Sequence, residues 1–263
     1  MKVNDQNFRE AISQGQYNGP TSGFRKGFVQ ANIVILPQTH ADEFIRFCLK
    51  NPKPLPILYA SEPGEFHLEK LSGHEDIRVS LPAYNVYENG KYIAGTENIH
   101  AWWRPDLVVI ALGCSFSFDS ALAEAGVRLD HLATGKNIAM YNTNIKLDST
   151  RHFSGDMVVT LRQLTTQQAI EAIQISNRFP FAHGAPIHFG NPADIGIESI
   201  HSPDYGDPPC QQEDYQETLI PVFWACGVTA QRTLEQADIP FFITHKPGCM
   251  LVTDLLNERL ILG

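Results

Sequence analysis

The fold is decided by the run Asp106-Leu-Val-Val-Ile-Ala-Leu-Gly-Cys-Ser-Phe-Ser-Phe-Asp-Ser-Ala-Leu-Ala-Glu-Ala-Gly126. Its first part, 106–112, is apolar almost throughout, which predicts a strand covered on both faces. Gly113-Cys-Ser115 then turns the chain, and 117–125 has the spacing of a helix that Gly126 ends. A strand, a turn and a helix in this order predict one unit of an α/β protein.

Units of the same kind lie on either side of this run. Toward the N-terminus, an apolar strand at 32–36 precedes a segment at 41–49 whose apolar residues recur at helical spacing. Toward the C-terminus, a strand at 220–225 is followed by a helix to about Gln236 and by a strand at 240–244. Strands that alternate with helices predict an α/β fold with a mostly parallel or mixed sheet and helices on both faces.

The middle of the chain has a different character. Its predicted elements are strands at 138–142, 155–162 and 185–189 and a helix at 166–177 that Thr165 caps. Strands that are not separated by regular helices are typical of an α+β arrangement. We therefore expect a smaller α+β domain at 127–215, inserted into a discontinuous α/β domain formed by 1–126 and 216–263.

Composition excludes several classes of function. A formal net charge of −9 argues against binding to nucleic acid or to an anionic membrane surface, both of which need a cationic face. The chain starts without an apolar signal segment, and its apolar runs are far shorter than the ~20 residues that span a bilayer. The five cysteines are scattered and form no C-x-x-C pair, so they predict thiols in a reducing compartment. We expect a soluble, cytoplasmic enzyme that acts on a small polar metabolite.

Ligands of open α/β sheets collect beyond the carboxyl ends of the strands, so the residues that follow each strand are candidates for a site. Gly113–Ser117 combines a turn, small hydroxyls and a helix start, which suits an anion. The alternative, favoured by spacing alone, is that Ser115 or Ser117 only caps the helix. Cys226 precedes another helix, where a thiol can have a lowered pKa, or it is simply a small buried residue.

Two further clusters contain histidines. Thr244-His-Lys-Pro-Gly248 places a proton-transfer group, His245, beside a cation, Lys246, that could hold a carboxylate. His183-Gly-Ala-Pro-Ile-His188 is followed by Asp204-Tyr-Gly-Asp207, and these groups together could bind a divalent metal such as Mn or Mg. Their spacing matches no standard metal motif, so a metal site is the less favoured interpretation. The chain also lacks the phosphate-loop, dinucleotide-binding and G-x-S-x-G motifs.

Taken in order, these segments resemble the D-glutamate cyclase family, whose bacterial members carry the name hydro-lyase. The resemblance covers nearly the whole chain and is carried by Gly19-Pro-Thr-Ser-Gly23, Gln30-Ala-Asn-Ile-Val-Ile-Leu-Pro37, Ile110-Ala-Leu-Gly-Cys-Ser-Phe-Ser-Phe-Asp119, Met140-Tyr-Asn-Thr-Asn144, Phe153-Ser-Gly-Asp-Met-Val-Val159, His183-Gly-Ala-Pro-Ile-His188, Pro203-Asp-Tyr-Gly-Asp207, Val222-Phe-Trp-Ala-Cys-Gly-Val-Thr229 and Thr244-His-Lys-Pro-Gly248. The chain departs from the family pattern at Ser13, Asn191, Ala230 and Lys246, where the family has Arg, Asp, Pro and Ala.

The resemblance implies a carbon–oxygen lyase that reversibly dehydrates D-glutamate to 5-oxo-D-proline. Such chemistry needs a base, an acid, donors for the oxyanion and a cation for the α-carboxylate. For catalysis we expect His183 or His245 as base and acid, with Cys114 and Cys226 lining the pocket and either available as a nucleophile on a covalent route. Expected substrate-binding residues are Thr21, Asn32, Ser115, Ser117, Asn144, Arg151, His188, Asp204, Asp207 and Lys246.

Two other functions remain open at this point. One is a hydro-lyase that removes water from a hydroxy acid, which a bound divalent metal would favour. The other is a protein that binds a small acid without turning it over. The expected partner in each case is a small acidic molecule, and a homodimer is possible.

Overall fold

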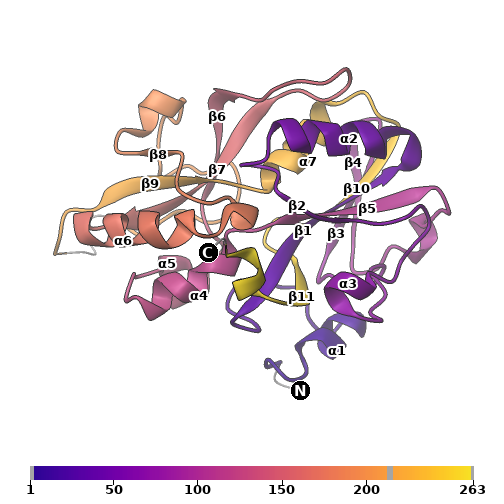
Figure 1. Cartoon of the computed structure of the whole chain (residues 1–263), viewed down its shortest axis with the longest axis horizontal. Helices are drawn as coiled ribbons and strands as arrows, with labels where there is room; N and C mark the ends of the chain where they lie inside the picture. The colour runs from indigo at the N-terminus through magenta and orange to yellow at the C-terminus, as the bar shows by residue number, and fades with distance from the viewer. Residues whose placement is uncertain (1–2, 212–215, 262–263) are drawn as a thin grey trace.

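The computed structural model describes residues 3–211 and 216–261, and it contains two antiparallel sheets (Figure 1). The larger sheet has the strand order β2-β5-β1-β10-β3-β4, with β11 also paired to β1. Its strands are β1 (Phe28–Pro37), β2 (Ile57–Ala60), β3 (Tyr84–Glu88), β4 (Lys91–Thr96), β5 (Leu107–Gly113), β10 (Phe241–His245) and β11 (Leu251–Leu256). The smaller sheet has the order β6-β7-β9-β8. Its strands are β6 (Met140–Lys146), β7 (Asp156–Leu164), β8 (His188–Phe189) and β9 (Ile220–Ala225).

Helices cover the faces of these sheets. The α-helices are α1 (Phe8–Ser13), α2 (Gln38–Lys50), α3 (Glu69–Ser72), α4 (Phe116–Glu124), α5 (Asp130–Thr134), α6 (Thr166–Asn177) and α7 (Val228–Gln236). Short 3-10 helices are η1 (His100–Trp102), η2 (Pro180–Ala182), η3 (Pro192–Ile195) and η5 (Asn257–Leu260). In Figure 1, α2 and α7 lie on one side of the larger sheet and α3 on the other, while α6 and α4 both lie below the smaller sheet. Among the described residues, every helix is too short or too polar to cross a membrane.

The central strands are apolar on both faces because both faces are covered. In β5, Val108 and Ile110 belong to the apolar cluster that contains α2 and α7, whereas Val109 and Ala111 belong to the cluster that contains α3. Adjacent residues of a strand point to opposite faces, so one strand supplies both clusters. The same alternation places Phe223 of β9 in the first of these clusters.

The predicted parallel or mixed sheet is wrong, because every strand pair recorded in the two sheets is antiparallel. The unit β1–α2–β2 does bring β2 back in the direction of β1, but β5 lies between them and runs the opposite way. An apolar run shows that both faces of a strand are buried, and it carries no information on the direction of its neighbours. The mixed α/β character is confirmed.

The predicted inserted domain is only partly a spatial unit. The smaller sheet takes β6, β7 and β8 from within 127–215, but β9 comes from the C-terminal segment and lies between β7 and β8. The predicted boundary at residue 215 lies outside the described residues. One apolar cluster contains residues of both sheets, among them Ile110 of β5 and Val159 of β7. The domain division stays a prediction.

Candidate active site

A small pocket lies where the two sheets meet, and we call it the interlayer pocket. It brings together six residues expected at the site, namely Asn32, Cys114, Ser115, His183, Cys226 and His245. The rest of its lining consists of Phe116, Asn137, Ile138, Met140, Thr160, Gly227, Val228, Gly248 and Met250. The free volume is about 20 Å³, room for about one water molecule. The two histidines and two cysteines that were expected to be catalytic thus all line one pocket.

His183 reaches this pocket from the end of η2. Its backbone has φ of 77°, a left-handed conformation that is uncommon for a residue other than glycine. Its Nδ1 lies 2.9 Å from the carbonyl oxygen of Lys53. Because a carbonyl can only accept, Nδ1 carries the proton, and the neutral ring therefore presents the Nε2 lone pair. This Nε2 is buried and has no hydrogen-bond partner among the described residues.

His245 ends β10 and faces the pocket from the larger sheet. Its Nδ1 lies 3.3 Å from both the amide nitrogen and the carbonyl oxygen of Ile33. The backbone therefore supports either tautomer, since Nδ1 can donate to the oxygen or accept from the amide. Nε2 of His245 is also buried without a partner in the described part of the chain. The two histidines thus differ, since only His245 can present Nε2 either as a donor or as an acceptor.

Burial sets the charge of both rings. Loss of hydration lowers the pKa of His183 to about 4, and the positive charges of Lys53 and Arg162 act in the same direction. Burial likewise lowers the pKa of His245 to about 4. Both imidazoles are therefore neutral near pH 7, the state in which a histidine can accept a proton.

Neither pocket cysteine has a lowered pKa, which was one of the two interpretations of Cys226. Burial raises the pKa of Cys114 to about 12 and that of Cys226 to about 11. Backbone N–H groups of Phe116 and Val228 donate to the two sulfur atoms and lower the pKa, but less than burial raises it. The dipole of a helix acts weakly against complete desolvation, so Cys226 agrees with the alternative interpretation of a small buried residue. Both residues are thiols at neutral pH.

Ser115 and Ser117 do not cap α4, contrary to the interpretation that their spacing favoured. The side chain of Ser115 makes no capping bond to the helix. Its Oγ instead accepts a hydrogen bond from Nη2 of Arg162 at 3.3 Å. Ser117 lies behind the pocket, where its Oγ accepts from the amide of Gln30 at 3.1 Å. The backbone N–H groups at this helix start donate within the turn, that of Ser117 to the carbonyl oxygen of Cys114 at 3.1 Å and that of Phe118 to the carbonyl oxygen of Ser115 at 3.2 Å.

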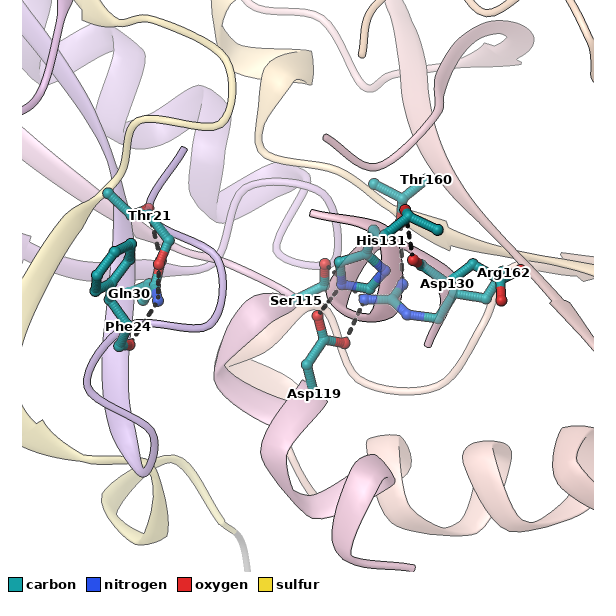
Figure 2. Close-up of polar contacts among 10 residues, drawn as sticks. Thr21, Phe24, Gln30, Ser115, Asp119, Asp130, His131, Thr160 and Arg162 are labelled. Carbon is teal, nitrogen blue, oxygen red and sulfur yellow. Dashed lines mark hydrogen bonds and ion pairs between the residues drawn. The ribbon is translucent and has the colours of Figure 1, made fainter. Parts of the chain in front are cut away.

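Below Ser115 lies a buried charge cluster, drawn in Figure 2, that the sequence analysis did not identify. Arg162 donates from Nη2 to Oδ1 of Asp119 at 2.6 Å, and Oδ2 of Asp119 lies 2.8 Å from Nε2 of His131 (Figure 2). The guanidinium carbon also lies 5.0 Å from the ring centroid of Trp224. All three polar residues are buried. The cluster holds Ser115 from below and fixes the start of α4.

The electrostatics of this cluster reach the pocket. Burial alone raises the pKa of Asp119, but the adjacent Arg162 and His131 outweigh it, so the pKa lies below its ordinary value. The carboxylate is therefore ionised and compensates the guanidinium. Arg162 also acts to lower the pKa of Cys114 and Cys226, although burial outweighs it. A cation lies within electrostatic range of both thiols.

The remaining expected substrate-binding residues do not line the interlayer pocket. Thr21 is buried behind it and supports its wall, because its Oγ1 accepts from the amide of Met250 at 3.1 Å. Those without a place in the lining are Asn144, Arg151, His188, Asp204, Asp207 and Lys246. Arg151 and Lys246, expected to hold a carboxylate, are exposed. Asp204 instead binds the amide group of Asn142 at 2.6 Å.

Within residues 3–211 and 216–261, no three His, Cys, Asp or Glu side chains are grouped as a metal site. His188 directs Nε2 to the carbonyl oxygen of Asn191 at 2.8 Å, and Asp207 accepts from the amide of Asn137 at 2.7 Å. These side chains are thus engaged with the backbone. A requirement for Mn or Mg stays a prediction.

The chain is similar in sequence to known proteins over nearly its whole length. Residues 108–254 match the D-glutamate cyclase family. A protein of Rhizobium johnstonii is 49% identical over 96% of this chain and 93% of its own length. Proteins of Burkholderia orbicola and Paraburkholderia phymatum are each 45% identical over 96% of this chain and 97% of their own lengths.

The chain belongs to the D-glutamate cyclase family. The names of all three relatives begin with "Putative hydro-lyase". The chain is thus an enzyme of the lyase class. Within this family, the matched region contains both pocket cysteines and both pocket histidines.

Proposed function

We propose that this member of the D-glutamate cyclase family reversibly dehydrates D-glutamate to 5-oxo-D-proline in the interlayer pocket. The observation that carries the proposal is the pair of buried neutral histidines whose Nε2 atoms lack partners in the described chain and line the same pocket. A buried polar atom without a partner is costly, so two of them in one pocket favour a ligand that pairs with them.

The fixed tautomer of His183 suits it to act as the base. Nδ1 is held by the carbonyl of Lys53, so Nε2 can take a proton from the α-ammonium group of the substrate. The amine that results attacks the carbon of the distal carboxyl group and forms a tetrahedral intermediate. The nitrogen of this intermediate still has one proton to lose, and one of its two anionic oxygens must gain two protons to leave as water. His183 returns its proton to that oxygen, and His245 accepts the remaining nitrogen proton at Nε2 and passes it to the same oxygen, so water leaves and both rings end neutral.

The substrate carboxylate and the tetrahedral oxyanion lie at the N-termini of α4 and α7 in this proposal. Helices α4 and α7 both begin at residues that line the pocket, Phe116 and Val228. The positive end of each helix dipole stabilises a carboxylate or a tetrahedral oxyanion. This supplies the anion-binding role that the exposed Arg151 and Lys246 do not fill from their positions.

A substrate of glutamate's size needs more room than the pocket has here, so binding must move part of its wall. Met140 and Met250 both line the pocket. Methionine side chains are unbranched and flexible and change their conformation easily. We expect these two side chains to move when an acid binds.

The test is proton NMR of the purified protein incubated separately with D-glutamate and with 5-oxo-D-proline, with and without Mn or Mg. We expect interconversion that His183→Asn and His245→Gln each slow by roughly 100-fold or more. Asn is chosen at 183 because it tolerates a positive φ. His74→Ala is the matched control, since the side chain of His74 is 92% exposed and should leave the rate unchanged.

No interconversion by a folded protein, judged by circular dichroism, overturns the proposed substrate. The related hydro-lyase reaction on hydroxy acids is then tested with the same variants and metals. Interconversion that both histidine variants leave intact overturns the assignment of base and acid. A ligand that binds saturably in the NMR titration without any product indicates a binding protein.

A further inference from the structure

Two turns with the same backbone path bring Cys114 and Cys226 to the pocket. In each, a strand ends directly before the cysteine and a helix of nine residues begins two residues after it. The residue between has φ −61° and ψ −19° at Ser115 and φ −65° and ψ −17° at Gly227. We call 113–116 and 225–228 the cysteine turns.

The hydrogen bonds of the cysteine turns also correspond. The carbonyl oxygen of Cys114 accepts from the amide of Ser117 at 3.1 Å, and that of Cys226 accepts from the amide of Thr229 at 3.1 Å. Each sulfur accepts from the backbone N–H two residues further along the chain. The two thiols are therefore presented in the same way, one from each sheet.

One side chain joins the two turns. Nδ2 of Asn32 donates to the carbonyl oxygen of Gly113 at 2.7 Å. A Cβ atom added to Gly227 would lie 2.1 Å from the same Nδ2, so the backbone of the second turn rests directly on this amide. Both cysteines belong to one apolar cluster and are 7% exposed. They are thus neighbours in a largely apolar pocket, although they are far apart in the sequence.

Independent features of the pocket point to a ligand between the turns. Nε2 of His183 and Nε2 of His245 line it without partners among the described residues, and the two residues are 1% and 2% exposed. The N-termini of α4 and α7 both start in its lining, where their dipoles favour an anion. If the two cysteines only filled space, the pocket would need neither the unpartnered imidazole nitrogens nor the two helix N-termini.

We propose that Cys114 and Cys226 form a two-base site that removes the proton from the α-carbon of a bound α-amino or α-hydroxy carboxylic acid and returns a proton to the opposite face. The proposal deepens the proposed function, since it assigns to the same pocket a change of configuration at the α-carbon. It rests on that function only for the choice of glutamate as the first substrate.

The step needs no further reactant. One cysteine is a thiolate and takes the α-proton, the C–H electron pair moves into the carboxylate, and an enediolate forms. The other cysteine is a thiol and gives its proton to the opposite face of the carbon. The configuration is inverted, and the two sulfur atoms exchange their protonation states. The positive ends of the two helix dipoles stabilise the enediolate charge.

The test follows D-glutamate and, separately, 5-oxo-D-proline in deuterium oxide with the full chain. Proton NMR reports loss of the α-proton signal, and chiral chromatography reports the opposite enantiomer. We expect both, with a rate that rises from pH 7 to 10, because burial raises the pKa of both thiols and the reactive form carries one thiolate.

The variants are Cys114→Ser and Cys226→Ser, with Cys210→Ser as the control at a thiol outside the interlayer pocket. Each pocket variant should lose inversion by about 100-fold or more, whereas Cys210→Ser should leave inversion unchanged. Each should still exchange the α-proton of one enantiomer, and the two variants should retain opposite enantiomers. A cysteine that only supported the fold would not give this complementary pattern.

Four results distinguish the two-base site from the proposed cyclisation or overturn one of them. Cyclisation without α-proton exchange overturns the two-base site and leaves the proposed function standing. Exchange and inversion without cyclisation support the two-base site and overturn the proposed function. Exchange that neither cysteine variant affects assigns the base elsewhere. If a folded protein exchanges the α-proton of no acid in a panel of α-amino and α-hydroxy acids, the two-base site is also overturned.

Discussion

The two buried histidines link the stability of the fold to pH. In the folded chain their pKa values lie at about 4, below the ordinary value of 6.5. As pH falls from 6.5 to 4, the unfolded chain binds these protons and the folded chain does not, so stability decreases over that window and is constant above it. The loss is on the order of 2 to 3 kcal/mol per histidine.

Urea unfolding at pH 7 and pH 4.5 checks this expectation. The matched comparison is His183→Asn/His245→Gln, which has no titrating ring at either position and should lose much less stability between the two pH values. An equal loss in the wild type and the variant would show that other groups cause the acid dependence.

The buried charge cluster should be costly to break from one side. Arg162→Met leaves the buried carboxylate of Asp119 without its guanidinium and should lower the free energy of unfolding by about 3–5 kcal/mol. Asp119→Leu alone leaves the cation unpaired and should cost a similar amount. The double variant removes both charges, so its loss should be well below the sum. Additive losses in urea unfolding at pH 7 would contradict a coupled pair.

Among single residues, those that follow predicted strands could be predicted as pocket residues from the sequence. Residues whose role depends on a partner far away in the sequence could not. Cys114, Cys226 and His245 could be predicted because each directly follows or ends an apolar run. Arg162 could not be predicted, because a charged side chain within a predicted strand is normally expected to face the solvent. Its role depends on Asp119, which lies 43 positions away. Only the fold brings the two charges together.

Among the elements, the cysteine turns depend on a glycine at one of two equivalent positions. Gly227→Ala would put a Cβ atom 2.1 Å from Nδ2 of Asn32, so this amide would have to move and release the carbonyl of Gly113. We expect a loss of about 1–3 kcal/mol in stability, as for overpacking of a core. We also expect turnover to fall by at least about tenfold, because displacement of reacting groups by ~1 Å costs that much or more.

Ser115→Ala is the comparison at the equivalent position of the other turn. Ser115 already has a Cβ, so this change only removes the contact with Arg162 and should cost about 1 kcal/mol. Thermal unfolding of both variants measures whether Gly227→Ala loses more stability than Ser115→Ala. Equal stability of Gly227→Ala and the wild type would show that Asn32 does not hold the two turns together.

Element types were predicted better than their pairing. The helix α6 was predicted with its bounds and with its cap, because Thr165 and Gln168 form a capping box that is local in sequence. Strand directions were predicted wrongly, although Asn89-Gly90 between β3 and β4 carries the usual signal of an antiparallel hairpin. Asn89 and Gly90 both have positive φ there, as such a turn requires. Periodicity reports burial, whereas direction depends on turns and on distant partners.

For the whole molecule, the interlayer pocket explains why neither sheet is a complete functional unit. Asn32 and His245 come from the larger sheet, and Thr160 comes from β7 of the smaller one. The cysteine turns likewise contribute one thiol from each sheet. A chain that lost the contact between the sheets would therefore lose the site even if both sheets kept their strands. The predicted homodimer adds nothing to this requirement and stays a prediction.

This dependence predicts cooperative unfolding of the entire chain. One apolar cluster contains Ile110 from the larger sheet together with Val159 and Phe223 from the smaller one. Separating the sheets would expose that cluster to water, which costs roughly 25 cal/mol per Å² of apolar surface. Segment 127–215 alone also lacks β9, the strand that joins β7 to β8. It should not fold by itself.

Differential scanning calorimetry of the full chain should then show one transition whose calorimetric and van't Hoff enthalpies agree. Segment 127–215 expressed alone should give the circular dichroism of an unfolded chain. Two separable transitions, or a protease-resistant fragment that corresponds to 127–215, would instead establish the inserted domain as an independent unit. In that case the apolar cluster would be an ordinary interface between domains, and the interlayer pocket could open by relative movement of the two sheets without unfolding of either.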